Sequence, residues 1–399
     1  MTTPITGYAE GFYGRLLGWA ERARILATLQ SLGMNTYYYA PKEDPWHRFD
    51  WRTPYPAEWH AEFQRFCNEA RQRDIRVVAG VAPGLDFDFS HLPEGDDFKR
   101  LVSKCALLLG DGANAISLLM DDIDTDFSAR SGVFNNEGEA HAALANALGV
   151  TLGITSPEEP GIWVTPRIYA DELIDEAPDY LPMFIDTLAE HHTVLYCGSD
   201  VVSQTLDGQS HGALCKKGEF DQSRNTPKHR VVLWDNLYAN DYCPRRLFVG
   251  AWRNRVNIQH VLLNPTGMVN TDCLLLTLMA DGLRQMGTND DELDMVSSWR
   301  NILSNHSVPE AFFHIAPYFD LPVFNSSGPA DACTDSACIR EAIEDCLWRW
   351  KTPLSREWYG AIFGLKHDLL TLSGEHAPLR IHKTQNAPLA RALINRTTL

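Results

Sequence analysis

The chain has 399 residues, of which 44% are hydrophobic, and carries a formal net charge of −17 at pH 7. This length exceeds the size at which a single core usually stops growing, so we expect one large domain and a smaller one. The negative charge would repel a phosphate backbone, and no basic stripe with interleaved aromatic residues offsets it. Nucleic acid is therefore not an expected partner.

Eight short apolar or β-branched runs recur along the first two thirds of the chain, and they predict β-strands. Helical patterns such as Trp19 to Leu32 and Trp59 to Arg73 lie between them. This alternation is typical of a (β/α)8 TIM barrel, although a doubly wound sheet would show it too; the number and length of the runs favour the barrel. The predicted strands are Ile5 to Ala9, Asn35 to Tyr39, Val77 to Ala82, Ala115 to Met120, Ile162 to Thr165, Thr193 to Tyr196, Val231 to Trp234 and His260 to Leu263.

The strand pattern stops near residue 285, and three amphipathic helices are predicted beyond it. They are Asp290 to Leu303, Ser336 to Trp350 and Arg356 to Leu372. The fold class is therefore predicted to be α/β, with a (β/α)8 barrel over residues 1–285 and a smaller all-helical domain over residues 286–399. We also expect that two copies of the chain form a homodimer through the helical domain.

The N-terminal segment Met1 to Gly7 is polar and lacks the charged-then-apolar pattern of a signal peptide. No apolar run reaches the roughly 18 residues that a membrane span needs. The nine cysteines are dispersed, mostly within apolar segments, which is typical of reduced core thiols. We therefore expect a cytoplasmic protein with no membrane partner. The sequence contains no Cys-x-x-Cys pair, so we do not expect a structural zinc site.

Polar residues follow six of the eight predicted strands. In a (β/α)8 barrel the functional site is built from the loops at the carboxyl ends of the strands, so these residues are expected to meet on one face. They are Gly11, the run Pro41 to Asp44, the pair Asp121 and Asp122, Tyr169, the run Trp234 to Asn236, and Asn264.

The sharpest pattern is an apolar strand that runs directly into carboxylates, Leu118-Leu119-Met120-Asp121-Asp122-Ile123-Asp124. A solvated charged loop is one interpretation, but a surface run would not normally extend a buried parallel strand. A divalent metal held by Asp121, Asp122, Asp124 and Asp126 is another. The strand context and the lack of a basic cluster for phosphates argue against it, so we expect no metal and no cofactor.

Adjacent carboxylates at a strand end are suited to acid and base work on two neighbouring atoms of one substrate, because successive side chains diverge. Their repulsion is expected to raise the proton affinity of one of them, which leaves one acid and one base at neutral pH. Ordinary glycosidases place two carboxyl groups about 5 to 10 Å apart across the bond they cleave. Sequence neighbours fit that geometry poorly, so a glycosidase built on this pair needs another nucleophile.

Six motifs lie within about residues 7 to 285. They are Glu10-Gly11-Phe12-Tyr13-Gly14-Arg15, Met34 to Tyr37 through Pro41-Lys42-Glu43-Asp44, His47-Arg48, Pro83-Gly84-Leu85-Asp86, Met120 to Asp124, and Trp234-Asp235-Asn236-Leu237-Tyr238-Ala239-Asn240-Asp241-Tyr242. On these motifs the sequence resembles glycoside hydrolase family 84, the O-GlcNAcases and their bacterial N-acetylglucosaminidase relatives. The resemblance implies substrate-assisted hydrolysis of terminal β-linked N-acetylglucosamine (GlcNAc) with retention, in which the sugar's own acetamido oxygen attacks and forms an oxazoline.

The resemblance also implies a role for each matched residue. Asp121 would hold and polarise the acetamido N–H, while Asp122 would protonate the leaving oxygen and then activate water. Tyr169 would contact the acetamido oxygen and Trp234 would wall the acetamido pocket. The sugar hydroxyl groups would be bound by Gly11, Lys42, Asn236, Asp241 and Asn264.

Structural alternatives remain for several of these residues. Trp234 could belong to the barrel core, Asn236 could form a turn, Lys42 could be a surface charge, and Asn264 could cap the turn that Pro265 opens.

Two positions depart from the family pattern. Arg167 lies in Val164-Thr165-Pro166-Arg167-Ile168-Tyr169-Ala170, where Cys-Pro-Thr-Glu-Tyr-Cys is common. Thr266 lies in Asn264-Pro265-Thr266-Gly267, where Asn-Pro-Asn is usual. The chemistry is expected to survive both changes, whereas the shape of the rim and the accepted aglycone are expected to depend on them.

Three rival functions remain at this point. A hyaluronidase-type glycosidase would use the same chemistry. A non-catalytic GlcNAc-binding protein would keep the pocket without turnover, but it has no use for a protonated carboxyl beside the glycosidic oxygen. A metal-dependent lyase or transferase would lose its activity in a chelator.

Overall fold

The structure, a computed structural model, describes residues 3–123, 127–156, 161–208, 214, 228–243, 246–286, 292–320 and 336–372. The chain divides into two compact units. The first comprises Met1–Asp241 and Ala251–Glu292, and the second comprises Tyr242–Gly250 and Leu293–Leu399. The short segment 242–250 therefore belongs to the helical unit although it follows a barrel strand in sequence.

The first unit is a closed barrel of parallel strands, in the order β1-β10-β8-β6-β5-β4-β3-β2. All eight predicted strands are present, so the prediction of a (β/α)8 barrel is confirmed. The barrel strands are β1 (Ile5–Glu10), β2 (Thr36–Tyr39), β3 (Arg76–Val81), β4 (Ala115–Leu119), β5 (Trp163–Thr165), β6 (Thr193–Tyr196), β8 (Arg230–Asp235) and β10 (His260–Leu263). A separate parallel pair consists of β7 (Leu206–Asp207) and β9 (Arg255–Val256).

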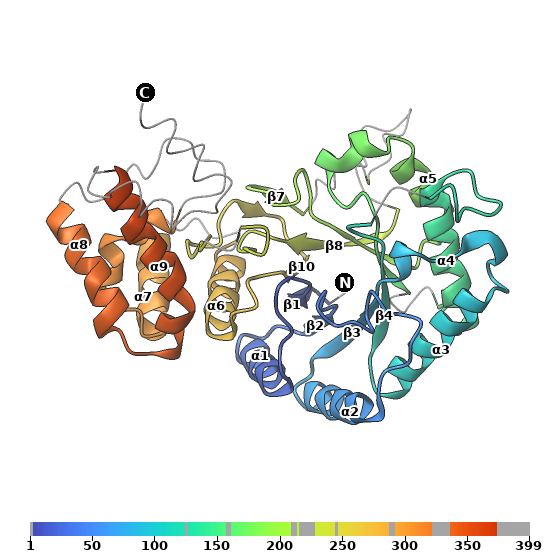
Figure 1. Cartoon of the computed structure of the whole chain (residues 1–399), viewed down its shortest axis with the longest axis horizontal. Helices are drawn as coiled ribbons and strands as arrows, with labels where there is room; N and C mark the ends of the chain where they lie inside the picture. Colours follow the sequence, from blue (N-terminus) through green and yellow to red (C-terminus); the bar gives the residue numbers. More distant parts are fainter. Residues whose placement is uncertain are drawn as a thin grey trace. The chain divides into compact units, whose positions relative to one another are not determined.

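Helices cover the outside of the barrel (Figure 1). In α2, the buried residues Phe63, Phe66, Cys67 and Ala70 recur at the spacing of one helical face, which explains why this segment packs as a helix. The helices of this unit are α1 (Trp19–Ser31), α2 (Ala57–Gln72), α3 (Asp96–Gly110), α4 (Glu137–Thr151), α5 (Tyr180–Thr187) and α6 (Val269–Gln285), with 3-10 turns at Pro83–Leu85, Phe89–His91 and Asp171–Glu176.

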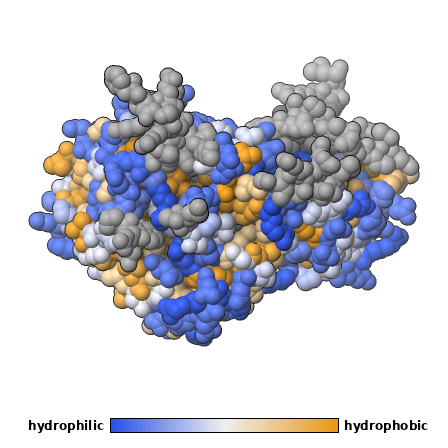
Figure 2. All heavy atoms as spheres, turned by 180° about the vertical axis from the view of Figure 1, so that it is seen from behind, coloured by the Kyte–Doolittle hydropathy of each residue, from blue (hydrophilic) through white to orange (hydrophobic). Residues whose placement is uncertain are grey.

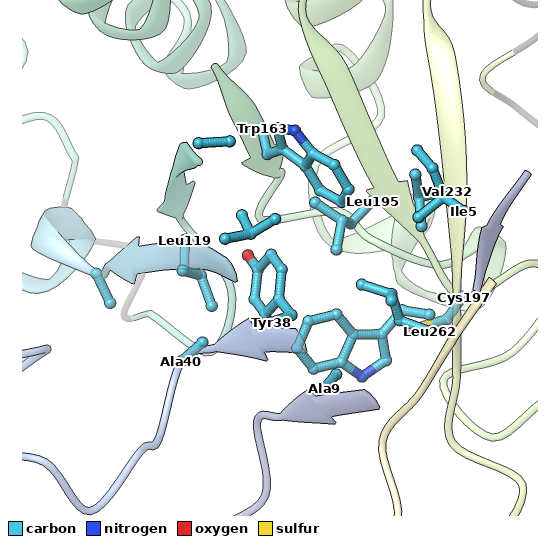
Figure 3. Packing of buried hydrophobic residues seen from close by; sticks show 14 of the residues in the cluster. Ile5, Ala9, Tyr38, Ala40, Leu119, Trp163, Leu195, Cys197, Val232 and Leu262 are labelled. Carbon is cyan, nitrogen blue, oxygen red and sulfur yellow. The ribbon is translucent and has the colours of Figure 1, made fainter. Parts of the chain in front are cut away.

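Side chains fill the interior of the barrel (Figure 3). The ring of Tyr38 meets that of Trp234 edge-on, with centroids 5.3 Å apart, and Tyr38 hydrogen-bonds Ser117 with 2.6 Å between the oxygens. At one point two strands approach so closely that only glycine fits, because a Cβ on Gly7 would lie 1.8 Å from the carbonyl oxygen of Thr36. A packed interior of this kind holds the loops at the strand ends on a rigid frame.

Four histidines are buried in the barrel unit with lowered pKa values, and His47 and His141 are the two most completely enclosed. The Nδ1 atom of His47 lies 2.9 Å from the carbonyl oxygen of Gly80, and that of His141 lies 2.7 Å from the hydroxyl group of Tyr180. Burial is the largest cause that lowers the pKa of each to about 3. Both groups therefore stay neutral in the folded protein at pH values where the unfolded chain takes up protons.

We expect acid to destabilise the fold through these two histidines. Below an unfolded-state pKa of about 6.5 the unfolded state binds more protons, so the free energy of unfolding falls as the pH falls. At pH 5.5 the expected loss relative to pH 7.5 is about 1.4 kcal/mol for each histidine. Urea denaturation at both pH values measures it, and His141→Gln should remove about 1.4 kcal/mol of the drop. An unchanged drop in this variant, or in wild type no drop at all, would contradict the prediction; exposed His91→Gln is the control.

The second unit is helical, as predicted, and consists mainly of α7 (Glu292–Asn305), α8 (Ser336–Glu344) and α9 (Pro353–Leu372), with shorter turns at Glu310–His314 and Ala316–Tyr318. A π-helical turn, Asp345–Arg349, ends the predicted helix that α8 begins. Phe312 packs against Trp358 in its core, with ring centroids 5.0 Å apart. The stretch Pro317 to Ala337 is rich in Pro, Ser, Gly and Asp, which predicts a loop, and its residues 321–335 lie outside the described residues.

One face of the molecule has hydrophilic and hydrophobic residues interspersed over its surface (Figure 2). Among the residues that the structure describes, no helix combines the length and the apolar character that crossing a membrane requires.

Candidate active site

The two aspartates follow β4 at the carboxyl rim of the barrel. The amide of Met120 still continues the sheet, donating to the carbonyl oxygen of Thr165 at 2.9 Å. Asp122 then adopts a left-handed backbone conformation, with φ of 54°. Arg48 donates from Nη2 to the carbonyl oxygen of Asp122. Strain of this kind in a residue other than glycine is common at functional sites, and here a buried arginine holds it in place.

Lys42 provides the positive charge of the site. Its ammonium group forms an ion pair with Oδ2 of Asp121 and lies 3.7 Å from Oδ2 of Asp122. The Lys42 side chain is only 2% exposed, so the prediction of a surface charge is excluded. The other carboxylate oxygen of Asp121, Oδ1, is buried and has no hydrogen-bond partner. Since an unpaired buried acceptor is costly, this atom marks a place for a donor from a substrate.

Two phenol groups hold the carboxylate of Asp122. Tyr13 donates its hydroxyl to Oδ2 at 2.8 Å, and Tyr169 donates to Oδ1 at 2.9 Å. Burial works to raise the pKa of Asp122, but the charge of Lys42, the two phenol hydrogen bonds and the charge of Arg48 outweigh it and hold this pKa below its usual value. Burial, followed by the charge of Asp122, raises the pKa of both tyrosines, so both remain donors.

The sequence predicts that repulsion between the two aspartates raises the proton affinity of one of them. Asp122 is not that residue, because the charge of Lys42, the two phenol hydrogen bonds and the charge of Arg48 outweigh its burial and lower its pKa.

A second group of polar side chains lies at the ends of β8 and β10. Oδ1 of Asn236 accepts from Trp234 Nε1 and from Asn264 Nδ2, each at 2.9 Å. Oδ1 of Asn264 in turn accepts from the amide of Gly11 at 3.2 Å. Asn264 thus bridges two strand ends, where the alternative interpretation made it a cap for the turn at Pro265. Trp234 belongs to the barrel core and to this group at the same time.

Gly11 brings the end of β1 against this group. A Cβ atom at this position would lie 2.3 Å from the Trp234 ring, so any larger residue would push the indole aside. Asp241 is joined to the loop that follows, because its Oδ2 accepts from the amide of Tyr13 at 3.0 Å. The same loop carries the Tyr13 hydroxyl group, which donates to Asp122, so it connects the Asn236 group with the aspartate pair.

The structure thus brings all nine predicted site residues to one rim. It adds Tyr13 and Arg48, which the sequence placed in family motifs without a role. The sequence points to these two residues only through their position, because each follows a barrel strand within a matched motif. Asp124 and Asp126 of the metal alternative lie outside the described residues. Within the described ranges, no cluster of three or more His, Cys, Asp or Glu side chains is arranged to hold a metal ion.

The two departures from the family pattern have structural partners. Arg167 forms ion pairs with Glu137 and Glu176. Thr266 donates to Oδ1 of Asp272 from its amide at 3.1 Å and from its hydroxyl at 2.7 Å. The side chain of Thr266 is therefore used to fix the start of α6.

Eight parallel strands with paired aspartates at their carboxyl rim define a (β/α)8 barrel with an acid–base site. The family model described as β-N-acetylglucosaminidase matches residues 6–316, and the chain belongs to this family. The resemblance seen in the sequence motifs is thereby confirmed.

Curated relatives include Protein O-GlcNAcase of Rattus norvegicus and that of Mus musculus, each 30% identical over 272 residues. The match covers 65% of this chain and only 28% of either relative. Among solved structures, a mutant of the Thermobaculum terrenum O-GlcNAc hydrolase superposes with a TM-score of 0.72 at 20% identity, covering 99% of this chain and 89% of that one. At this identity the superposition supports the fold alone.

Proposed function

We propose that the barrel hydrolyses terminal β-linked GlcNAc with retention, through an oxazoline formed by the substrate's own acetamido group. The observation that carries the proposal is the unpaired, buried Oδ1 of Asp121 beside the solvent-accessible carboxylate of Asp122. One oxygen is placed to accept an N–H from the sugar while the neighbouring carboxyl works on the glycosidic oxygen. Residues 1–285 form the proposed catalytic domain and residues 286–399 the proposed helical domain.

The proposed first step forms one bond and breaks another at the anomeric carbon. The acetamido oxygen attacks this carbon, the glycosidic C–O bond breaks, and the proton of Asp122 goes to the departing oxygen. Asp121 accepts the hydrogen bond of the acetamido N–H and stabilises the positive charge that develops as the ring closes. In the second step water attacks the same carbon, its proton returns to Asp122, and the acetamido group is regenerated.

Asp122 must bind a proton before the first step, although the unliganded site favours its ionised form. A sugar that enters the site excludes water from this carboxyl and takes the place of a phenol hydrogen bond. Both changes raise the pKa of Asp122, since they weaken the support for its charge. The substrate thus converts Asp122 from a carboxylate into the acid that the first step requires.

The remaining site residues are proposed to bind the sugar. Asn264 donates a hydrogen bond to Asn236. A sugar hydroxyl group can replace this hydrogen bond by donating to one asparagine and accepting from the other, so no buried polar group is left unpaired. Trp234 walls the acetamido pocket and Tyr169 contacts the acetamido oxygen. The proposed hydroxyl-binding residues are Gly11, Lys42, Asn236, Asp241 and Asn264.

The proposal is tested with 4-nitrophenyl β-glycosides of GlcNAc, N-acetylgalactosamine and glucose. We expect rapid release from the GlcNAc compound, much slower release from the glucose compound, which has no acetamido group, and a β-anomer as the first sugar product by proton NMR. GlcNAc binding without turnover would instead indicate a sugar-binding protein. Loss of activity in EDTA would indicate a metal enzyme, and cleavage within hyaluronan chains would indicate a hyaluronidase-type glycosidase.

The proposed partner is a glycan or glycoprotein that ends in GlcNAc. Protein is included because the relatives are named Protein O-GlcNAcase. The cysteines that the structure describes are free, which supports a reducing, cytoplasmic location.

A homodimer through the helical domain is also proposed. Trp348 is 51% exposed there, and its ring lies against that of Tyr359, with centroids 5.9 Å apart. Light scattering would measure the oligomeric state, and Trp348→Glu should then yield monomers. A wild-type monomer at micromolar concentration would contradict the proposed dimer.

A further inference from the structure

We propose that Arg167, which touches no catalytic group itself, is a positioning residue that holds the hydroxyl group of Tyr169 against the carboxylate of Asp122. This inference rests on the proposed acid and base role of Asp122. Arg167 is also one of the two positions where the chain departs from its family pattern. The proposed role of Arg167 is therefore a feature of this chain.

The guanidinium group of Arg167 ties the segment after β5 to two other elements. Its Nη1 lies 3.0 Å from Oε2 of Glu137, the first residue of α4, and its Nη2 lies 3.4 Å from Oε2 of Glu176, the last residue of the 3-10 turn Asp171–Glu176. The side chains of Arg167 and Glu137 are 6% and 11% exposed, respectively. A pair this well buried is screened little by solvent and has a defined geometry.

The backbone of the same segment is held at two further points. The amide of Arg167 donates to the hydroxyl oxygen of Tyr180 at 2.9 Å, and the carbonyl oxygen of Tyr169 accepts from the amide of Cys197 at 2.8 Å. Ile168, between them, is buried. Three attachments over three residues therefore fix the position from which the Tyr169 side chain reaches Asp122.

Burying the Arg167–Glu137 ion pair carries a desolvation cost. Burial raises the pKa of Glu137 although Arg167 opposes the shift, and Oε1 of Glu137 is buried without a hydrogen-bond partner. Apolar residues of similar volume often stabilise a fold at least as well as a buried ion pair. The pair therefore serves to fix the position of the segment after β5 more than to stabilise the fold.

The consequence at the site follows from the groups that face Asp122. From the loop after β1 comes Tyr13, from the loop after β2 come Lys42 and Arg48, from the segment after β4 comes Asp121, and from the segment after β5 comes Tyr169. Four of these five favour the ionised form of Asp122, because they donate to it or carry a positive charge. Tyr169 is the one whose position depends on Arg167.

Loss of the Arg167 ion pair should loosen Tyr169 and raise the pKa of Asp122. Asp122 then keeps its proton to higher pH, so the basic limb of the kcat/KM profile moves upward. The expected shift is about half to one pH unit, the size expected for one hydrogen bond. KM should change more in Tyr169→Phe than in Arg167→Met, because Tyr169 is proposed to contact the sugar whereas Arg167 does not.

The experiment compares pH profiles of kcat/KM on the methyl β-glycoside of GlcNAc, whose basic leaving group needs the proton of Asp122, for wild type, Arg167→Met, Arg167→Lys and Tyr169→Phe. Arg167→Met and Tyr169→Phe should shift the basic limb alike, Arg167→Lys should restore much of the wild-type profile, and the double variant should shift no further than Tyr169→Phe. Arg73→Met is the matched control, because it removes an ion pair to Glu69 at 2.8 Å near the end of α2. If Arg167→Met does not fold, Glu176→Gln replaces it in the experiment, because it weakens the more exposed of the two ion pairs of Arg167.

The inference is overturned if Arg167→Met, or Glu176→Gln in its place, keeps the wild-type profile while Tyr169→Phe shifts it. It is also overturned if the shifts of the two single variants add in the double variant. The proposed function fails separately, through full activity of Asp122→Asn on the same methyl glycoside, and that outcome does not depend on Arg167.

Discussion

Replacement of Asp122 by asparagine is expected to lower kcat/KM roughly 10²- to 10⁴-fold on GlcNAc glycosides with alkyl or peptide leaving groups. Asparagine keeps the shape of the side chain and can accept one of the two phenol hydrogen bonds on its amide oxygen, but it has no acidic proton to give to the glycosidic oxygen. A 4-nitrophenyl leaving group hardly needs that proton, so activated aryl glycosides should be spared much more. The dependence on the leaving group therefore reports the general acid.

Asp121→Asn should behave differently, because Asp121 is assigned to the acetamido N–H. The positive charge of ring closure develops whatever the leaving group, so every substrate should slow by a similar factor. The measurement is log kcat/KM against leaving-group pKa for both variants. A steeper slope for Asp121→Asn than for Asp122→Asn would reverse the two roles, and nearly wild-type lines for both would return the pair to a solvated loop.

Removal of the positive charge at the centre of the site should also have a large effect. Lys42→Met leaves the buried carboxylate of Asp121 without its ion pair. It also removes the positive charge that lies 3.7 Å from the carboxylate of Asp122. Breaking a buried pair by removing one partner costs about 3–5 kcal/mol of stability. The pKa of Asp122 should rise as well, because the charge of Lys42 is the strongest influence that lowers it.

The sign of the pH dependence makes the Lys42 prediction specific. Protonation of a carboxylate removes the unpaired charge, so the stability deficit of Lys42→Met should be largest near pH 8 and shrink towards pH 5. Urea denaturation across this range measures the deficit. Lys99→Met, which removes an exposed ion pair with Asp96 at 3.9 Å, is the control and should change stability by less than about 1 kcal/mol. A small, pH-independent deficit in Lys42→Met would mean that Lys42 does not balance the aspartates.

The barrel and its rim could be predicted from the sequence because both depend on local patterns. Apolar runs mark the strands, and parallel strands of one barrel place their carboxyl ends on the same face. Asp121, Tyr169 and Asn264 could therefore be assigned to one site although they are far apart in the chain. The motifs supplied the roles.

The finer arrangement depends on contacts that no local pattern contains. Tyr13 meets Asp122 across 109 positions of sequence, and Arg48 binds the carbonyl group of Asp122 across 74. The sequence shows two adjacent aspartates and predicts repulsion, but it does not show the cations and phenols that surround them. For the same reason the lowered pKa of Asp122 and the buried partner of Arg167 emerge only from the structure.

Participation of the acetamido group is the central claim, and substitution of that group tests it most directly. The substrates are 4-nitrophenyl β-glycosides whose N-acetyl group carries zero, one, two or three fluorine atoms, with the rest of the sugar unchanged. Fluorine withdraws electrons from the acetamido oxygen, so kcat/KM should fall steeply and continuously along the series, because that oxygen is the nucleophile. A flat series, in which the trifluoroacetyl substrate reacts as fast as the acetyl one, would contradict the account and require a nucleophile from the protein.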